Sequence, residues 1–460
     1  MQDTQTARRR YDELPYVARP YVDLHPDRLA TEAALSGFAA PALEHASVLE
    51  IGCGVGVHLT LLAVEWPNAQ FVGFDIAEVQ IEAARDLARQ LGVDNVRFEV
   101  MDLMELPRTY PTFDYILVHG LYSWVPTPVR DALMSVLRRH LAPTGVASVS
   151  LNTYPGWGPR RAMRDLMLLA ARGSASPAET IKRGRRALQL LAQHSTRETP
   201  WHQTLNEHHA HLDELPDNYL FHDFLADVNQ PVWLHEFIAD CDAHSLSLLG
   251  PADVERLDVA EGRGFRHQCL VHSKRTPDSL KPRLDQLRIA GNLRVDGSDI
   301  VHDDGRLVSA GDAEVRSVLV QLSALRPLSL PMSQVLETSD SVRSAEALRA
   351  RLIDLYRQGV VDLRLRPDRC VDYVSERPEV WSIARAFAAK GAFYTPNLRH
   401  EAVCLDEFHR VLVSLCDGAH TRQQLHAALA EVVTQTSDQA LDQQLQHSLL
   451  KLSFDALLIA

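Results

Sequence analysis

The stretch that decides the fold is "SVLEIGCGVG", residues 47–56, in which a short apolar run leads into a glycine-rich turn. The run is typical of a buried β-strand, and residues 56–66, "GVHLTLLAVEW", carry apolar residues at helical spacing. Such a turn lets the backbone approach a ligand closely and directs the amides of the helix N-terminus toward it. The sequence therefore predicts a ligand site directly after the first strand.

The spacing of the glycines narrows the kind of ligand. Gly52, Gly54 and Gly56 follow Glu50 in a GxGxG pattern. A dinucleotide-binding fingerprint requires its third glycine where Val57 stands, and a Walker loop requires Lys-Ser or Lys-Thr after the last glycine. An acid followed by this spacing resembles the class I S-adenosylmethionine-dependent methyltransferases, and the resemblance implies that Glu50 faces the methionine amino group.

Strand and helix patterns alternate as far as about residue 150. Residues 70–75, 96–101, 113–120 and 145–152 read as further buried strands, and residues 77–92 and 129–143 show helical periodicity. This alternation predicts a parallel sheet with helices on both faces. We expect an α/β fold class: a Rossmann-like, doubly wound, mostly parallel methyltransferase core, a helical middle domain and a C-terminal α+β winged-helix-like region.

The last third of the chain contains a weak internal repeat. "VLVQL" at 318–322 recurs as "VLVSL" at 411–415, and residues 348–363 share their apolar pattern with residues 445–460. Each unit reads as a winged-helix module. The expected domains are 1–172 for cofactor binding with an N-terminal cap, 173–280 for a helical regulatory domain, and 281–460 for two winged-helix-like units.

Composition limits the partners and the compartment. A net charge of -13 argues against nucleic acid as the main partner, because phosphate binding needs concentrated Lys and Arg. The six cysteines form no CxxC pair, and no signal peptide or run of about 18 apolar residues is present. We expect a cytoplasmic protein without membrane partners. The spacing of His208, His211 and His222 matches no zinc signature, so we expect no metal.

Acidic residues end the next two strands of the expected sheet. Asp75 ends the second strand, where a carboxylate can accept both ribose hydroxyls, and Asp102 follows the third. The methyltransferase resemblance assigns Asp102 to the adenine amino group and places His119, at the end of the fourth strand, beside the sulfonium. Ligands of open parallel sheets lie outside these strand ends. The expected cofactor contacts also include the adjoining residues Cys53, Ile76 and Leu103.

An aromatic loop follows the fourth strand. "HGLYSWVP", residues 119–126, places Tyr122 and Trp124 at the expected position of the methyl group. Methyl transfer is an in-line displacement that demands positioning and exclusion of water, and aromatic faces attract cations by about 0.5 to 2 kcal/mol. Tyr122 and Trp124 are therefore candidate walls for the acceptor. The alternative is that both pack under the following helix.

Longer motifs carry a more specific resemblance. The aromatic loop, residues 11–33, "NTYPGW" at 152–157 and residues 218–237 closely resemble the bacterial methyltransferases that carry a methyltransferase regulatory domain. That family includes the lysine methyltransferases of rickettsial outer-membrane protein, and the resemblance covers nearly the whole chain. It implies S-adenosylmethionine as the cofactor and a protein as the substrate.

The resemblance also implies roles for residues outside the glycine loop. Tyr21, His25 and Arg28 become candidates for contacts to the methionine end or the substrate mouth, although His25 and Pro26 can equally begin a helix. A second pocket wall is implied at the exit of the fifth strand, and it consists of Asn152, Tyr154 and Trp157. His119, Tyr122 or Asn152 is expected to orient the lone pair of an acceptor amine.

We expect a methyltransferase that acts on protein lysine side chains. One alternative is a methyltransferase for a small biosynthetic molecule, which would predict a closed pocket. The other is a binding protein with a vestigial core, which the intact glycines and acids argue against. The expected partners are a protein or small-molecule acceptor, with no nucleic acid and a possible homodimer.

Overall fold

The computed structural model divides the chain into two compact units, one from Met1–Ala18 and Ala40–Thr276, the other from Arg19–Ala39 and Pro277–Ala460. The structure describes residues 14, 19–194, 199, 203, 206, 209, 212, 214–250, 254–277, 284–337, 339, 341–432 and 437–459.

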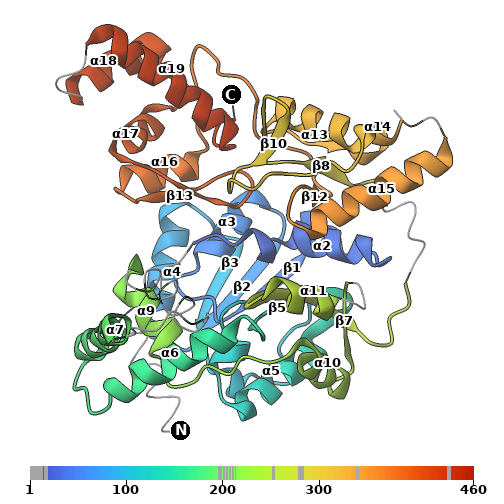
Figure 1. The fold of residues 1–460 in the computed structure, drawn as a ribbon, viewed down its shortest axis with the longest axis vertical. Coiled ribbons are helices and arrows are strands. Elements are labelled where there is room, and N and C mark those ends of the chain that lie inside the picture. The colour runs from blue at the N-terminus through green and yellow to red at the C-terminus, as the bar shows by residue number, and fades with distance from the viewer. Residues whose placement is uncertain are drawn as a thin grey trace. The chain divides into compact units, whose positions relative to one another are not determined.

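A seven-stranded sheet organises the first unit, in the order β3-β2-β1-β4-β5-β7-β6. Five strands run parallel and the last two are antiparallel to their neighbours. Figure 1 shows the sheet in blue to green. The strands are β1 Ser47–Ile51, β2 Gln70–Asp75, β3 Val96–Val100, β4 Phe113–Val118, β5 Leu141–Asn152, β6 Leu246–Leu248 and β7 Phe265–His272. The chain order reverses beside β1, which is where open sheets of this type bind ligands.

The connecting helices agree with the sequence-based expectation to within a few residues. They are α3 Val57–Glu65, α4 Glu78–Gln90 and α5 Thr127–His140. The sheet buries apolar side chains such as Leu49, Phe74 and Ile116, each exposed by at most 2%. The predicted α/β class with a doubly wound, mostly parallel sheet is therefore confirmed.

The segment that was expected to be helical also supplies two strands, β6 and β7, to this sheet. Its helices are α6 Trp157–Ala170, α7 Pro177–His194, α9 Asp217–Phe224, α10 Leu234–Ala243 and α11 Val254–Glu261. Polar residues interrupt the apolar run of β7, but they have partners: Arg266 pairs with Asp258, and Gln268 donates to the Leu249 carbonyl at 2.6 Å. The apolar pattern did not indicate β7, because its polar side chains find their partners only in the folded structure.

The C-terminal residues of the second unit show the repeated helix order that the sequence predicts. The first module contains β8 Arg288–Ala290, β9 Leu293–Asp296, β10 Asp299–His302, α13 Ala313–Leu325, β11 Leu330–Pro331, α14 Met332–Leu336, α15 Val342–Arg357 and β12 Asp362–Arg364. The second contains α16 Ser382–Ala389, β13 Tyr394–Pro396, β14 Ala402–Cys404, α17 Glu407–Leu415, α18 Arg422–Val432 and α19 Asp438–Phe454. The repeated "VLVQL" and "VLVSL" fall on α13 and α17, at equivalent places.

The N-terminal helix α2, Pro26–Leu35, belongs to the second unit. Arg28 pairs with Asp362 at 2.8 Å and lies over the Tyr356 ring, and the Asp27 carboxylate accepts from the Arg366 amide at 3.1 Å. The sequence-based boundaries grouped this segment with the methyltransferase core. Its partners follow more than 300 residues later, so local sequence did not reveal them.

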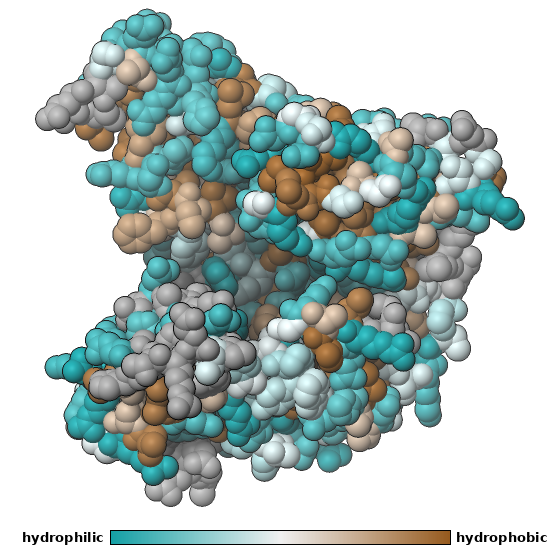
Figure 2. All heavy atoms as spheres, in the orientation of Figure 1, coloured by the Kyte–Doolittle hydropathy of each residue, from teal (hydrophilic) through white to brown (hydrophobic). Residues whose placement is uncertain are grey.

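The surface of the second unit includes exposed apolar side chains on β9, in the segment after β10 and on α13. Val295, Leu307 and Val320 have exposed fractions of 43%, 74% and 37%. Figure 2 shows hydrophobic atoms over this region, within a largely hydrophilic face. Single exposed apolar residues are normal on a protein surface.

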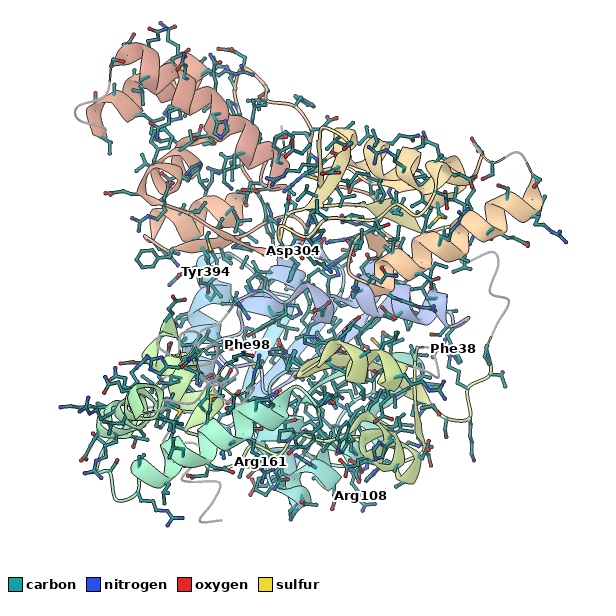
Figure 3. The ribbon with its side chains drawn as sticks, in the orientation of Figure 1. Phe38, Phe98, Arg108, Arg161, Asp304 and Tyr394 are labelled. Atoms are coloured by element: carbon teal, nitrogen blue, oxygen red, sulfur yellow. The ribbon has the colours of Figure 1, made fainter. Side chains whose placement is uncertain are left out.

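We predict that Gly56→Ala destabilises the first unit more than Gly92→Ala. Both glycines have a positive φ, of 65° and 66°, so both variants carry the same backbone strain. A Cβ at Gly56 would lie 2.6 Å from the ring of Phe98, which Figure 3 labels, whereas a Cβ at Gly92 would meet nothing within 4 Å. Overpacking of this kind costs about 1 to 3 kcal/mol beyond the shared strain. Equal shifts in the thermal midpoints of the two variants would contradict this packing.

Candidate functional site

The ends of the central strands meet along one edge of the sheet. Ile51 pairs with Phe74 on one side and with Val118 on the other. One residue further, the same register places Asp75, Gly52 and His119 in a row. Residues in register across a sheet share a face, so the row presents its side chains together.

Glu50 is a buried acid at the end of β1. It is 4% exposed, and its Oε2 atom has no hydrogen-bond partner among the described residues. Burial, aided by the negative charge of Asp75, raises the pKa of Glu50 to about 8. Leaving a buried polar atom unsatisfied is costly, and an ammonium group supplies both the donor and the charge that Glu50 lacks. Glu50 therefore fits the amino group of a methionine-like ligand.

Asp75 fixes the glycine loop. One carboxylate oxygen accepts from the Gly54 amide at 3.0 Å and the other from the Ala77 amide at 2.9 Å. A carboxylate oxygen has lone pairs for further donors, so these bonds leave capacity for ribose hydroxyls. The backbone of Gly52 has a φ of 76°, and no atom lies within 4 Å of the position of a Cβ there. The loop thus offers open space beside an oriented carboxylate.

The other expected cofactor residues surround this loop. Cys53 is buried behind it, and Ile76 is partly buried. Asp102 caps the short helix Leu103–Glu105 and accepts from the Met104 amide at 2.9 Å, while Leu103 is buried. The structure brings these residues to the expected strand ends. The assignment of Asp102 to an adenine amino group stays a prediction.

His119 meets a residue that the sequence analysis missed. Its Nδ1 lies 3.0 Å from Nε2 of His267 on β7, and the edge of Phe265 faces both rings. Neither partner was singled out, because β7 was not expected in the sheet. The signal was present in "FRHQ" at 265–268, where the aromatic residue and the histidine alternate at strand spacing.

Tyr122 packs into the core and does not form an open acceptor wall. It is 3% exposed, its ring meets Phe237 edge-on at 4.9 Å, and its hydroxyl donates to Asp240 at 2.8 Å. Burial and the nearby carboxylate of Asp240 raise the pKa of Tyr122 above its usual value. The alternative, that Tyr122 is a packing residue, fits the structure better. Helix α10 covers its ring, and the local sequence gives no sign of this contact.

Trp124 and Trp157 share one apolar cluster with α6, α7 and α9. Their rings meet edge-on at 6.2 Å, and Trp157 also lies 5.8 Å from Phe224. Trp157 is 3% exposed, and Trp124 is partly buried. The structure therefore places Trp157 inside the protein, which does not support its predicted role as a pocket wall.

Asn152 and Tyr154 differ in exposure. Asn152 is buried, and its amide donates to Asn229 at 3.2 Å. Tyr154 is partly exposed, its ring lies 5.5 Å from that of Trp233, and its hydroxyl accepts from Arg161, labelled in Figure 3, at 3.2 Å. Among the expected wall residues, Tyr154 is a partly exposed aromatic beyond the exit of β5, and Trp233 is an aromatic neighbour that sequence reasoning missed.

The predicted N-terminal contacts lie in the second unit. His25 caps α2 by accepting from the Asp27 amide at 3.0 Å, which confirms that His25 and Pro26 begin a helix. Tyr21 lies beside Arg19, and Arg28 is engaged by Asp362. Contacts of Tyr21, His25 and Arg28 to a cofactor stay predictions. Of the histidines weighed as metal ligands, His208 and His211 lie outside the described residues, and His222 bonds the Leu14 carbonyl at 2.5 Å.

Three family models match parts of the chain. A methyltransferase domain matches residues 48–145, a predicted methyltransferase regulatory domain matches 216–256, and the C-terminal winged helix domain described for PKMT matches 376–448. The last match covers the second of the two predicted winged-helix-like units.

Proteins of Rickettsia are similar to this chain. RP789 of Rickettsia prowazekii is 36% identical over 250 residues, which are 54% of this chain and 45% of RP789, so the match spans about half of that relative's length. RP028 of the same organism is 33% identical over 242 residues, 52% of this chain and 96% of RP028. The structure of PKMT2 from Rickettsia typhi in complex with AdoHcy covers 97% of this chain and 100% of its own, with a TM-score of 0.82 and 23% identity. That likeness shows a shared fold.

None of the helices in the described residues has the length and apolar character needed to cross a membrane.

We predict that binding of S-adenosylmethionine releases about one proton at pH 6.5. With its pKa near 8, Glu50 is protonated in the free protein, and it ionises when it pairs with the cofactor's ammonium group. Affinity should therefore rise by about tenfold per pH unit from pH 5.5 to 7.5. Calorimetry in buffers of different ionisation enthalpy counts the proton.

The matched control is Glu50→Gln, which keeps the side-chain shape but has no proton to release. Its affinity should be weaker and should no longer rise with pH in this way. The same proton release from Glu50→Gln as from the parent protein would show that another group titrates.

We predict that Tyr122→Phe lowers stability without lowering turnover. The variant removes a buried hydrogen bond to a carboxylate, at a cost of about 1.5 to 3 kcal/mol, but leaves the ring in place. Tyr110→Phe, which removes a similar bond to Glu99 at 2.9 Å, is the control. Denaturation midpoints and kcat are measured together; a tenfold loss of kcat confined to Tyr122→Phe would place this hydroxyl in the chemistry.

Proposed function

Because the chain belongs to the class I S-adenosylmethionine-dependent methyltransferases, we propose that it transfers methyl groups to lysine side chains of proteins. The observation that carries the proposal is the extent of the likeness to PKMT2, which covers 97% of this chain. A methyltransferase for small molecules needs only the sheet domain and a closed pocket. The match of the C-terminal residues 376–448 to a PKMT winged helix supports a protein substrate.

The residues of the strand ends have complementary tasks in this proposal. Glu50 holds the ammonium group of the cofactor, Asp75 accepts ribose hydroxyls while it fixes the Gly54 amide, and Asp102 accepts from the adenine amino group. When bound, S-adenosylmethionine supplies an electrophilic methyl group on a sulfonium. The protein's own contribution is to orient this group beside the exit of β4 and to exclude water.

The acceptor must reach this edge as a neutral amine. Keeping a lysine neutral at pH 7 costs about 4.6 kcal/mol in water, so the site must desolvate the ammonium group or take its proton. The partly exposed pair Tyr154 and Trp233 suits the approach of a lysine, because aromatic faces attract cations and pack against alkyl chains. A homodimer and the regulatory role of the middle segment stay predictions.

The test is incubation with methyl-labelled S-adenosylmethionine and a dialysed cell extract, followed by separation of protein from small molecules. We expect label in protein, and mass spectrometry of digested protein should place it on lysine. The control is Glu50→Gln, which should reduce the label by at least about tenfold through weaker cofactor binding. Label confined to small molecules would establish the biosynthetic alternative, and an equal signal from Glu50→Gln would assign the labelling to a contaminant.

A further inference from the structure

Two histidines from distant parts of the chain meet at the cofactor edge of the sheet. His119 follows β4, and His267 belongs to β7, which pairs with β5 through Ser150 and His267. The register between β4 and β5, continued by one residue beyond Val118 and Val149, places His119 opposite Ser150. Gly52, His119, Ser150 and His267 therefore lie in one row, with the small Ser150 between the two imidazoles.

The geometry of the pair allows the two rings to share one proton in a hydrogen bond. His119 Nδ1 and His267 Nε2 lie 3.0 Å apart, and the planes of the rings differ by 17°. Such a bond requires one nitrogen to donate and the other to accept, so it forms when the two rings are neutral or share one added proton, and fails when both are cationic. The two histidines are thus joined by one hydrogen bond along which a proton can pass.

Neighbouring residues keep the histidine pair in place. Phe265 approaches the rings edge-on, at 5.9 Å from His119 and 5.1 Å from His267, and is 40% exposed. The Ser150 hydroxyl accepts from the Gly120 amide at 2.8 Å, which fixes the exit of β4. The rings are partly buried and lie at the sheet edge, which distinguishes them from histidines of the core.

Charged and titratable groups of the neighbouring strands lie on the same face as the pair. Glu50, two residues before Gly52 on β1, shares this face, Asp75 lies in the row itself, and Cys269, two residues after His267 on β7, is on the same face. Arg266 points to the opposite face, where it pairs with Asp258.

We propose that His119 and His267 form a relay that takes the proton from the acceptor lysine, an inference that rests on the proposed function. The ammonium passes a proton to His119 Nε2, the shared proton moves from His119 Nδ1 to His267 Nε2, and His267 Nδ1 releases a proton to solvent. The neutral amine then forms a bond to the methyl carbon while the carbon–sulfur bond breaks. The electron pair of that bond remains on sulfur, and the methylated amine carries the positive charge. His119 is the catalytic residue, and His267 positions it and exports the proton.

The test compares His267→Gln with His45→Gln. Glutamine at 267 can keep a hydrogen bond to His119 but cannot carry the proton onward. His45 is an exposed histidine before β1, at the opposite edge of the sheet, and serves as the matched control. The assay measures transfer of methyl label from S-adenosylmethionine to dialysed extract protein as a function of pH, and calorimetry measures cofactor affinity separately.

For the parent protein and His45→Gln, we expect kcat to rise with pH and then level off, because the relay takes the proton from the lysine. For His267→Gln, we expect kcat at pH 7 to fall by about tenfold to 100-fold and to keep rising into the alkaline range, because solvent must take the proton. Cofactor affinity should change by less than about threefold. An unchanged pH profile in His267→Gln would overturn the relay and leave His267 a packing residue.

A second readout does not depend on turnover. Nuclear magnetic resonance of the full chain labelled with ¹⁵N-histidine should show a proton shared between His119 Nδ1 and His267 Nε2, and this signal should be absent from His267→Gln. Absence of the shared signal from the parent protein would contradict the relay. If the parent protein labels no extract protein at any pH, the proposed lysine chemistry itself fails, an outcome distinct from an unchanged profile.

Discussion

The buried carboxylate of Glu50 is the constraint on which the site depends. Burial and the charge of Asp75 raise its pKa to about 8, and its Oε2 atom has no donor among the described residues. The sign of this shift means that Glu50 contributes most to stability below about pH 4.5, and that the contribution is lost as the pH rises through about 8. A cationic ligand removes this penalty. The protein therefore keeps at the end of β1 an acid that a bound ammonium group would satisfy.

The register of the sheet places the other residues of the candidate site beside this acid. Because β1 lies between β2 and β4, the residues that follow the three strands form a row beside Glu50. The antiparallel strand β7 extends the row to His267. The proposed ligand site and the proposed proton relay thus both depend on the same backbone pairing of the sheet.

The parts of this arrangement that sequence could predict are those with local signals. The glycine loop, Asp75 and the parallel strands were readable because their periodicity and turn residues lie within short segments. The burial of Tyr122 could not be predicted from the local sequence, because its cover, α10, follows more than 100 residues later. His267 was missed for the same reason, since its role depends on pairing between β5 and β7.

The N-terminal segment illustrates the limit in another way. The resemblance made Tyr21, His25 and Arg28 candidates for contacts to the methionine end or the substrate mouth. In the structure, Arg28 pairs with Asp362 on β12, and the Asp27 carboxylate accepts from the Arg366 amide. Charged residues at the start of a helix are interpreted as solvated surface when the sequence does not identify their partners.

We propose that this edge of the sheet binds the cofactor through Glu50. A crystal structure of the protein with S-adenosylhomocysteine tests this binding mode most directly. We expect the ligand's amino nitrogen within hydrogen-bond distance of Glu50 Oε2, its ribose hydroxyls on Asp75 and its sulfur beside His119. A ligand bound elsewhere, or one whose amino group leaves Glu50 unpaired, would contradict it.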